Sequence, residues 1–466
     1  MAQLDESLSY VRDRVADCTR AGRSVRVTTH TDCDGIAAGA IITKALSRRG
    51  TRYATRTADE FSGGLIASLK SDPRDLHIIT DLGGGFAAEL DRELGDSWII
   101  LDHHQIPDGE ADNERVVNAW RFGIDGGTEV CGGGMAYLAA RAMDDANTDL
   151  AGAAVVAALG DRQDAGERRS LTGKNHEIAE EARGAGLLES GLDLLLVGRE
   201  TRPLADALAF TSQPFIEGLT WNRDACAAAL ESAGVSLKEG GRWRVPAELD
   251  QDEKGRVMEE VARSAGGGAA ATAGMIGYAY TFPGEDGRGF LRDGREFATM
   301  LNSCGRAKRA GAGMAVCMGE RGDMLREAEG VLARYRTEIR DYMEMLGGQR
   351  WRFAEGERHV VVNGQDVIPE SMTGTISSLM AGSPRNAGKV VILHTRAEEN
   401  AVKFSSRKAP GCSPGINLSR IMRSGAEKFD GIGGGHDAAA GAKVSRERLD
   451  EFLKYLDASV QDTAGS

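Results

Sequence analysis

The feature that most constrains the fold is a unit repeated in the N-terminal part of the chain. Each unit is a short run of β-branched and apolar residues that ends in a polar cluster, and such runs occupy residues 24–29, 76–80 and 98–101. Helical stretches lie between them, beginning with the apolar segment 36–50. This alternation is typical of a parallel α/β sheet. Because ligands bind at the carboxyl ends of parallel strands, the polar clusters predict one shared site.

Length and composition set the broad class. The chain has 466 residues, more than one ordinary core holds, so we expect two or three domains. A hydrophobic content of 41% and a charged content of 27% fit a folded protein. The chain has no uncharged apolar window of about 18 residues, and its polar start is unlike a signal peptide. We therefore expect a cytoplasmic protein without a membrane partner.

Cysteine usage and charge exclude other classes. The 7 cysteines form no CxxC pair, which argues against a disulfide framework and against a zinc ribbon. A net charge of −13 argues against a protein that coats nucleic acid by bulk attraction. The 61 glycines lie largely in short clusters beside Asp, His or Ser, which suggests backbone brought close to a ligand.

The first polar cluster is HTDCDG at residues 30–35. Its carboxylates Asp32 and Asp34 stand two residues apart and could reach two neighbouring cations. The same residues could equally form a turn that caps the next helix. Asp81 ends the second strand, and the triplet DHH at 102–104 ends the third. Adjacent imidazoles at a strand end seldom serve packing, and one can bind a metal while the other faces a phosphate.

A fourth cluster, GDRQD at residues 160–164, follows an apolar helix and contains Asp161 and Asp164. Alone it could be a solvated helix end, but four such clusters together favour a site of carboxylates and histidines. Oxygen ligands with one or two imidazoles suit Mn²⁺ or Mg²⁺ better than zinc. Two such ions could activate a water and stabilise an in-line phosphoryl displacement.

A second group of candidates lies near the C-terminus. The stretch GIGGGHD at 431–437 predicts either an ordinary loop or a cradle of backbone donors for an anion. KFSSRK at 403–408 ends a strand with hydroxyls and cations, which suits a phosphate. In NSCGR at 302–306, Arg306 is either part of a capped turn or a contact to the same substrate.

The remaining patterns outline the rest of the chain. Residues 186–262 favour charged helices, and the Gly/Ala-rich stretch 263–274 predicts a connector. Elsewhere the patterns predict helices at 4–21, 150–159, 322–346 and 445–460, and strands at 275–281, 313–318, 359–363, 390–394 and 401–405.

These motifs resemble a known family. HTDCDG, the Asp81 strand end, DHH and GDRQD are similar to the four motifs of the DHH phosphoesterase superfamily. GGGHDAAAGA at 433–442, with FSSR at 404–407, resembles its DHH-associated C-terminal domain. More narrowly, the chain resembles the archaeal RecJ-like single-strand exonucleases through VGRETRPLADALAF (197–210), EFATMLNSCGR (296–306) and TGTISSLM (373–380).

The resemblance implies an α/β fold in three parts, with the active site in a cleft between the first and the last. These parts are a parallel-sheet DHH domain over 1–190, a helical insertion with a connecting helix over 191–345, and a smaller α/β DHH-associated domain over 346–466. Related pyrophosphatases carry a ligand histidine four residues before the first aspartate, where this chain has Thr28.

The resemblance also implies roles for individual residues. One Mn²⁺ or Mg²⁺ ion would be held by Asp34, Asp81, His103 and Asp161, and a second by Asp32 and Asp81 with His30 nearby. His104 would face the scissile phosphate while Asp102 orients the histidine pair. The phosphates of the substrate strand would be held by Ser406, Arg407, Gly433, Gly434, Gly435, His436 and Arg306.

Three functions follow as alternatives. The first is an exonuclease on single-stranded DNA or RNA that serves DNA replication or repair. The second is a phosphodiesterase of very short oligonucleotides or cyclic dinucleotides, which an aromatic content of only 5% keeps open. The third is a replisome scaffold that binds the GINS complex. The complete set of candidate ligands argues against an inactive scaffold, whereas an active nuclease that also binds GINS stays open.

Overall fold

The computed structural model describes residues 2–72, 74–106, 113–212, 214–264, 272, 274–397, 400–435 and 437–462. They form two compact units. The first unit combines residues up to 207 with 236–254 and 274–333, and the second combines 208–235, 255–273 and the chain from 334 onward. The domain boundaries at 190 and 345, and the cleft between domains, stay predictions.

The first unit is built on a five-stranded parallel sheet with strand order β2-β1-β3-β4-β5. Its strands are β1 (Ser24–His30), β2 (Arg52–Ala58), β3 (Leu76–Thr80), β4 (Trp98–Asp102) and β5 (Val116–Asn118). The predicted parallel sheet is confirmed. Every residue of β3 and β4 is buried, in keeping with their mainly apolar sequences.

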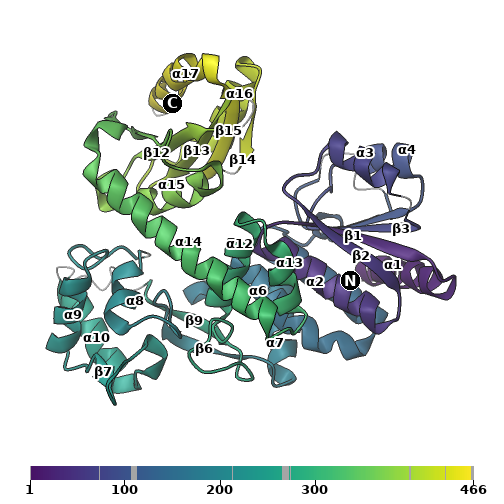
Figure 1. Ribbon diagram of the computed structural model, residues 1–466, viewed down its shortest axis with the longest axis horizontal. Helices are drawn as coiled ribbons and strands as arrows, with labels where there is room; N and C mark the ends of the chain where they lie inside the picture. Colours follow the sequence, from purple (N-terminus) through teal and green to yellow (C-terminus); the bar gives the residue numbers. More distant parts are fainter. Residues whose placement is uncertain are drawn as a thin grey trace. The chain divides into compact units, whose positions relative to one another are not determined.

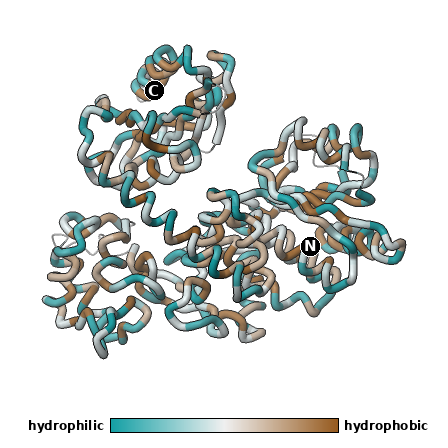
Figure 2. Tube along the Cα trace, in the orientation of Figure 1, coloured by the Kyte–Doolittle hydropathy of each residue, from teal (hydrophilic) through white to brown (hydrophobic). Residues whose placement is uncertain are grey.

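Helices cover both faces of this sheet (Figure 1). Helices α3 (Gly63–Ser71) and α4 (Ala87–Leu94) enclose a core with Ile79, Trp98 and Ile100 on one face. Helices α1 (Ala2–Arg20), α2 (Cys33–Arg48) and α5 (Gly132–Met143) pack on the other. In Figure 2 the strands of this sheet carry much of the hydrophobic colour, as buried strands should.

A third layer packs on α2. It consists of α6 (Ala151–Gly160), α12 (Gly294–Arg306) and α13 (Ala310–Cys317), and the last two pack against each other. The predicted strand at 313–318 is wrong, because these residues belong largely to α13. A Cβ atom on Gly313 would lie 3.1 Å from Leu301 and 3.2 Å from Ile36, so small residues let this helix approach its neighbours. A short apolar run cannot by itself distinguish such a helix from a strand.

The middle of the chain is mainly helical, as expected, with two short antiparallel strand pairs. The elements are α7 (Gly173–Gly184), β6 (Glu189–Leu194), α8 (Leu204–Phe210), α9 (Arg223–Ser232), β7 (Lys238–Glu239), β8 (Arg242–Trp243), α10 (Gln251–Ser264) and β9 (Ile276–Thr281). Strand β6 pairs with β9, and β7 pairs with β8. Most of the predicted connector, residues 265–271 and 273, lies outside the described residues.

The long helix α14 (Asp323–Gly348) leads to the C-terminal domain. Its six-stranded sheet has the order β10-β11-β12-β13-β15-β14. The strands are β10 (Phe353–Glu355), β11 (His359–Asn363), β12 (Val390–Arg396), β13 (Ala401–Lys408), β14 (Ile432–Gly435) and β15 (Ala439–Ser445), and the helices are α15 (Thr373–Ala381), α16 (Leu418–Lys428) and α17 (Leu449–Asp462). Phe404 and Phe452 are fully buried in its core.

Two details of this domain differ from the predictions. The glycine-rich stretch is not a loop, since Gly433, Gly434 and Gly435 belong to the edge strand β14, which pairs antiparallel with β15. The final helix begins at Leu449 rather than Ser445, because Ser445 ends β15. Among the described residues, no helix combines the length and the apolar content needed to cross a bilayer.

Candidate metal centre

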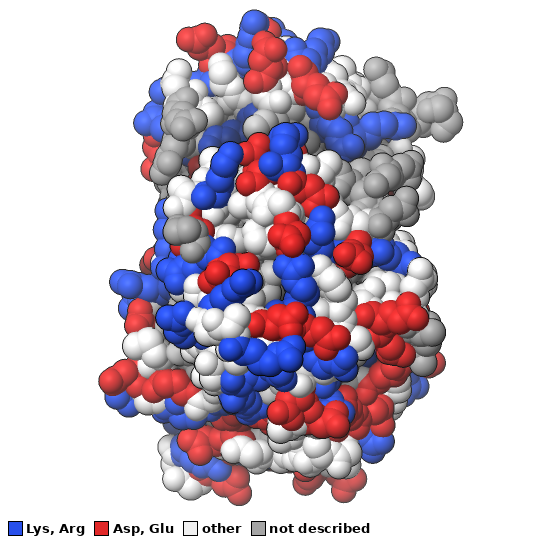
Figure 3. Space-filling view, turned by 90° about the vertical axis from the view of Figure 1, so that its right-hand side faces the viewer, with Lys and Arg blue, Asp and Glu red and all other residues white. Residues whose placement is uncertain are grey.

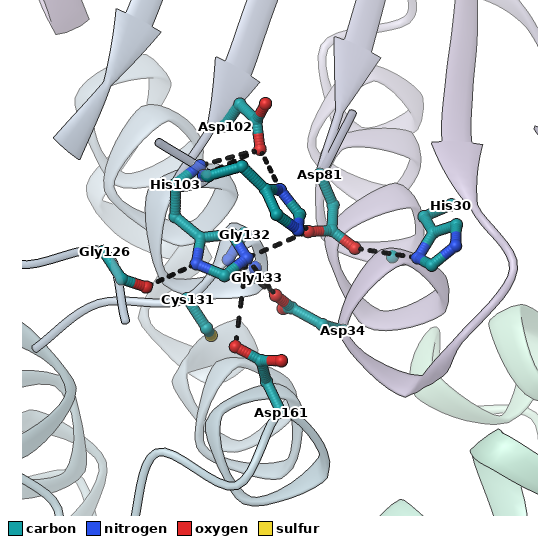
Figure 4. Close-up of polar contacts among 12 residues, drawn as sticks. His30, Asp34, Asp81, Asp102, His103, Gly126, Cys131, Gly132, Gly133 and Asp161 are labelled. Carbon is teal, nitrogen blue, oxygen red and sulfur yellow. Dashed lines mark hydrogen bonds and ion pairs between the residues drawn. The ribbon is translucent and has the colours of Figure 1, made fainter. Parts of the chain in front are cut away.

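The carboxyl edge of the parallel sheet gathers the predicted ligands (Figure 4). Asp32 and Asp34 follow β1 at the start of α2, Asp81 follows β3, and His103 follows β4. Asp161 directly follows α6, and the packing of α6 on α2 brings it to the same place. Residues separated by up to 129 positions therefore share one site, as the strand-end clusters predicted.

His103 lies at the centre of the first group. Its Nε2 atom is 3.2 Å from Oδ1 of Asp81, 3.4 Å from Oδ2 of Asp34 and 3.9 Å from Oδ2 of Asp161. Its Nδ1 atom donates to the carbonyl of Gly126 at 2.6 Å. In the neutral ring this bond leaves the Nε2 lone pair facing three carboxylates, an arrangement that a divalent cation would stabilise. Burial lowers the pKa of His103, but Asp81, Asp34 and Asp161 outweigh it and hold that pKa well above its usual value.

Asp81 gives the strongest indication of a cation site. Its side chain is 2% exposed, and neither carboxylate oxygen has a hydrogen-bond partner among the residues that the structure describes. Burial raises the pKa of Asp81, yet His103 and His30 lower it further than burial raises it, so the group is ionised. A buried, ionised carboxylate without hydrogen bonds is costly unless a cation or other charge lies beside it. The residues present therefore fit a metal site.

Asp34 is held in place by the start of α5. The backbone N–H groups of Gly132 and Gly133 donate to its Oδ2 at 2.7 Å and its Oδ1 at 2.6 Å. The approach requires glycine, because a Cβ atom on Gly132 would lie 2.7 Å from the Cβ of Asp81. Burial, followed by the charge of Asp81, raises the pKa of Asp34 well above its usual value. The CGGG run at 131–134 is thus a sequence signal for this site that the predicted motifs did not include.

Asp161 is oriented by Gln163, a second residue that sequence reasoning missed. Gln163 is fully buried, and its amide donates at 2.8 Å both to Oδ2 of Asp161 and to the carbonyl of Gly126. The amide of Asn175 donates in turn to Oε1 of Gln163 at 2.6 Å. Because Gly126 also accepts from His103, this network joins two candidate ligands. Such outer partners normally fix the geometry of metal ligands.

A second group shares Asp81. Nδ1 of His30 is 3.2 Å from Oδ1 of Asp32 and 3.5 Å from Oδ2 of Asp81. The side chain of Asp32 is 43% exposed, so this group opens to solvent whereas Asp34 and His103 are buried. Burial lowers the pKa of His30, but Asp32 and Asp81 together raise it to about 11. The two oxygens of Asp81 thus face different groups, as a bridging ligand requires.

His104 and Asp102 form a pair beside these groups. Nδ1 of His104 is 2.8 Å from Oδ1 of Asp102, whose other oxygen accepts from the N–H of Gly84 at 3.0 Å. Asp102 is buried, while the side chain of His104 is 55% exposed. The hydrogen bond with Asp102 raises the pKa of His104 to about 9. The imidazole can therefore offer a proton to a group that approaches from solvent.

Asp164 lies apart from the cluster. It pairs with Nη2 of Arg295 and with Nη2 of Arg169, each at 2.7 Å. Within the GDRQD stretch, Asp164 therefore forms ion pairs rather than a contact to the candidate ligands.

The predicted substrate contacts lie elsewhere in the chain. Ser406 is fully buried and its hydroxyl donates to the carbonyl of Ala440, so a phosphate contact would require this hydroxyl to leave that partner. Arg407 is held by the hydroxyls of Ser378 and Ser405. Gly433, Gly434 and Gly435 lie in β14, Arg306 ends α12, and His436 is outside the described residues.

The charge on one face of the molecule gives little indication of a long nucleic-acid track. On the face shown in Figure 3, Lys and Arg side chains are interspersed with Asp and Glu side chains. A continuous basic stripe would favour tight binding of a long strand, because phosphate contacts add along it.

Three family models match the chain. The DHH family N-terminal domain matches residues 24–160, the DHH-CID domain matches residues 196–272, and the DHHA1 domain matches residues 359–462. The first match contains β1, β3 and β4 with most of the candidate ligands, and the third contains the C-terminal sheet from β11 onward.

Known proteins resemble the chain over nearly its whole length. An uncharacterized protein of Methanocaldococcus jannaschii is 27% identical over 444 residues, which cover 93% of this chain and 92% of the relative. RecJ of Thermus thermophilus in complex with Mn²⁺ has a TM-score of 0.60 at 17% identity and covers 98% of this chain. This chain spans only 55% of that RecJ.

Two further structures match at full length. An exonuclease RecJ bound to manganese has a TM-score of 0.59 at 17% identity, over 98% of this chain and 94% of its own. CDC45 from Entamoeba histolytica has a TM-score of 0.67 at 11% identity, over 98% of this chain and 99% of its own. At these identities the likeness establishes a shared fold.

Proposed function

Because the chain belongs to the DHH superfamily and is RecJ-like, we propose that it is a metal-dependent exonuclease that hydrolyses phosphodiester bonds of single-stranded DNA or RNA. The enzyme would act in the cytoplasm and would serve DNA replication or repair. The observation that carries the proposal is the buried Asp81 carboxylate, which has no hydrogen-bond partner in the described part of the chain and faces His103 with one oxygen and His30 with the other.

The proposed site holds two Mn²⁺ or Mg²⁺ ions. Asp34, His103 and Asp161 would bind one ion together with Asp81, whose Oδ1 lies 3.2 Å from His103, and Asp32 and Asp81 would bind the other, with His30 beside it. Bound ions of this kind supply a nucleophilic water at neutral pH and stabilise the charge that develops on a phosphate. The N–H groups of Gly132 and Gly133 keep Asp34 in one orientation, so the ligand set is preorganised.

His104 and Asp102 would act on the substrate directly. The exposed imidazole of His104 can donate a hydrogen bond to a phosphate oxygen, and its bond with Asp102 keeps the ring oriented and protonated. Arg306 and Arg407 would bind further phosphates. A general acid or hydrogen-bond donor in this position contributes roughly 10²- to 10⁴-fold to the rate of phosphoryl transfer.

Very short substrates are an alternative within the same chemistry. The mixed charge on the face in Figure 3 and the aromatic content of 5% favour few phosphate and stacking contacts. A second candidate function, binding to GINS in the replisome, is favoured by the fold that the chain shares with CDC45. The full set of candidate ligands fits a chain that keeps its enzymatic activity in either case.

The test is a digestion of end-labelled single-stranded DNA and RNA oligomers with Mn²⁺, with Mg²⁺ and with chelator. We expect stepwise, metal-dependent loss from one end, which also gives the polarity and the sugar preference. The Asp81→Asn variant should be inactive, and Asp145→Ala, which removes a carboxylate that is 95% exposed, should match the wild type. Cleavage of di- to tetranucleotides alone would favour the short-substrate alternative, and no cleavage of any oligomer would overturn the enzymatic proposal.

A further inference from the structure

Helix α12 contacts both chain segments that bring distant ligands into the metal centre. It packs on α2, which begins between Asp32 and Asp34, and on α6, which ends just before Asp161. The sequence motif over this helix contributed only Arg306 to the predicted site. The other polar residues of the helix have a role that neither catalysis nor substrate binding accounts for.

The C-terminal part of α12 holds the first ligand turn. Oδ1 of Asn302 accepts the backbone N–H of Cys33 at 3.0 Å, across 269 positions of sequence. Cys33 is the first residue of α2, and the first N–H groups of a helix have no partner within it. Because this N–H belongs to the peptide between Asp32 and Cys33, the bond fixes the backbone that separates the two ligand carboxylates.

Close backbone packing reinforces this contact. A Cβ atom on Gly305, three residues after Asn302, would lie 1.8 Å from the carbonyl oxygen of Thr31. Only glycine can occupy this position without moving the turn. The helix therefore touches the turn at two points, one polar and one steric.

The N-terminal part of α12 holds the second ligand segment. Arg295 donates through Nη2 and Nε to Oδ2 of Asp164 at 2.7 and 3.1 Å, and through Nη1 to the carbonyl of Tyr278 at 2.8 Å. Asp164 is three residues beyond Asp161 and its side chain is 6% exposed. Arg295 and Asn302 are seven residues apart, which is about two turns, so they lie on the same side of the helix.

The helix itself is anchored independently of the metal centre. Oε1 of Glu296 accepts the backbone N–H of Glu200 at 2.7 Å, and its other oxygen accepts the hydroxyl of Thr201. Glu296 is 4% exposed, so these bonds are shielded from water. A helix fixed in this way can hold the two ligand segments at a constant separation.

We propose that Asn302 and Arg295 are positioning residues that set the separation of the Asp32–Asp34 turn and the Asp161 segment for metal binding. The inference rests on the proposed metal-dependent function. Outer partners of metal ligands typically contribute about 10- to 100-fold in metal affinity. In this proposal Asn302 and Arg295 affect metal binding only indirectly, by holding the segments that carry the ligands.

The experiment measures the Mn²⁺ dissociation constant of the full chain by calorimetry, together with the thermal midpoint of the metal-free chain. Asn302→Leu keeps the size of the side chain but removes the acceptor, and we expect Mn²⁺ to bind about 10- to 100-fold more weakly. Asn302→Asp keeps an acceptor oxygen and should restore the affinity to within a few-fold of wild type. Ser303→Ala is the matched control, because Ser303 is buried in the same helix and, among the described residues, its hydroxyl donates to the carbonyl of Met300 alone.

Arg295→Lys provides a second, independent variant. It keeps the charge but loses the two-pronged bond to Asp164, so it should also weaken Mn²⁺ binding. If Asn302→Leu does not fold, Arg295→Lys alone tests the positioning role.

The outcomes separate this inference from the proposed function. A wild-type chain that binds no Mn²⁺ would overturn both. Normal Mn²⁺ binding by wild type, by Asn302→Leu and by Arg295→Lys would overturn the positioning role alone. Equal weakening in Ser303→Ala would also overturn it, since the effect would then reflect the stability of the helix.

Discussion

The Nε2 atom of His103 lies 3.2 Å from Oδ1 of Asp81, although the other nitrogen of the same ring donates to the carbonyl of Gly126. When the ring is neutral, Nε2 of His103 and Oδ1 of Asp81 are therefore both hydrogen-bond acceptors, and they face each other. The carboxylates of Asp34 and Asp161 add to the negative charge around the same nitrogen. A single proton on His103 offsets only one of these charges, whereas divalent cations would offset most of them.

Replacing the bridging carboxylate should separate activity from stability. We predict that Asp81→Asn lowers kcat/KM by on the order of 10³-fold or more, because a ligand shared by both ions is lost. Asn suits the left-handed backbone at this position, where φ is 59°. Because His103 and His30 lower the pKa of Asp81 below its usual value, the ionised carboxylate stabilises the metal-free fold, so we expect the metal-free variant to lose some stability but to stay folded.

Steady-state kinetics and thermal unfolding in chelator measure the two effects. A metal-free Asp81→Asn chain that is unfolded at the assay temperature would indicate that the carboxylate serves the fold instead.

Removing the exposed imidazole should affect turnover and leave metal binding unchanged. We predict that His104→Gln lowers kcat by about 10²- to 10⁴-fold, since the donor to the phosphate is lost. Mn²⁺ affinity, measured by calorimetry, should stay near that of wild type, because the side chain of His104 is 55% exposed and binds Asp102. Loss of Mn²⁺ binding in this variant would make His104 a metal ligand.

Adding one methyl group at the start of α5 should disturb the ligand geometry. In Gly132→Ala, the new Cβ atom would lie 2.7 Å from that of Asp81, and we predict a loss of about 1–3 kcal/mol of stability together with weaker Mn²⁺ binding. Gly184→Ala at the end of α7 is the control, because a Cβ atom there meets nothing within 4 Å. Chemical denaturation and Mn²⁺ titration of both variants test this, and equal behaviour of the pair would contradict it.

The C-terminal domain should lose stability in acid through His394. Burial lowers the pKa of His394 from 6.5 to about 4. Protonation therefore favours the unfolded chain: the full stability is present above about pH 6.5 and is lost as the pH falls toward 4, by about 3 kcal/mol in all. In His394→Phe, which keeps an aromatic ring beside Phe404, the dependence should flatten over this range. Denaturation series at several pH values check this, and parallel curves for both chains would rule His394 out.

The sequence predicted the parallel sheet because β3 and β4 are buried on both sides and are mainly apolar in sequence. Strand β2 was not predicted, since RYATRTA is polar and the strand lies at the edge of the sheet with half-buried residues. Strand β5 has only three residues. Strand β14 was not predicted, because its glycines carry no alternating pattern and favoured a loop or an anion cradle instead.

The candidate ligands were predictable because each lies within a few residues of the end of a strand or of an apolar helix. The groups that hold these ligands in place by hydrogen bonds were not predictable. The N–H groups of Gly132 and Gly133, the carbonyl of Gly126 and the amide of Gln163 contribute through backbone atoms or a neutral side chain. Their hydrogen bonds to Asp34, His103 and Asp161 depend on tertiary packing, which cannot be inferred from the local sequence.

The most direct test of the account is a crystal structure of the chain grown with Mn²⁺, with anomalous scattering used to locate the metal. We predict two manganese peaks, one on each side of the Asp81 carboxylate, with His103 at one and Asp32 at the other. A single peak that Asp81 does not touch, or no peak in this group of side chains, would contradict the central claim.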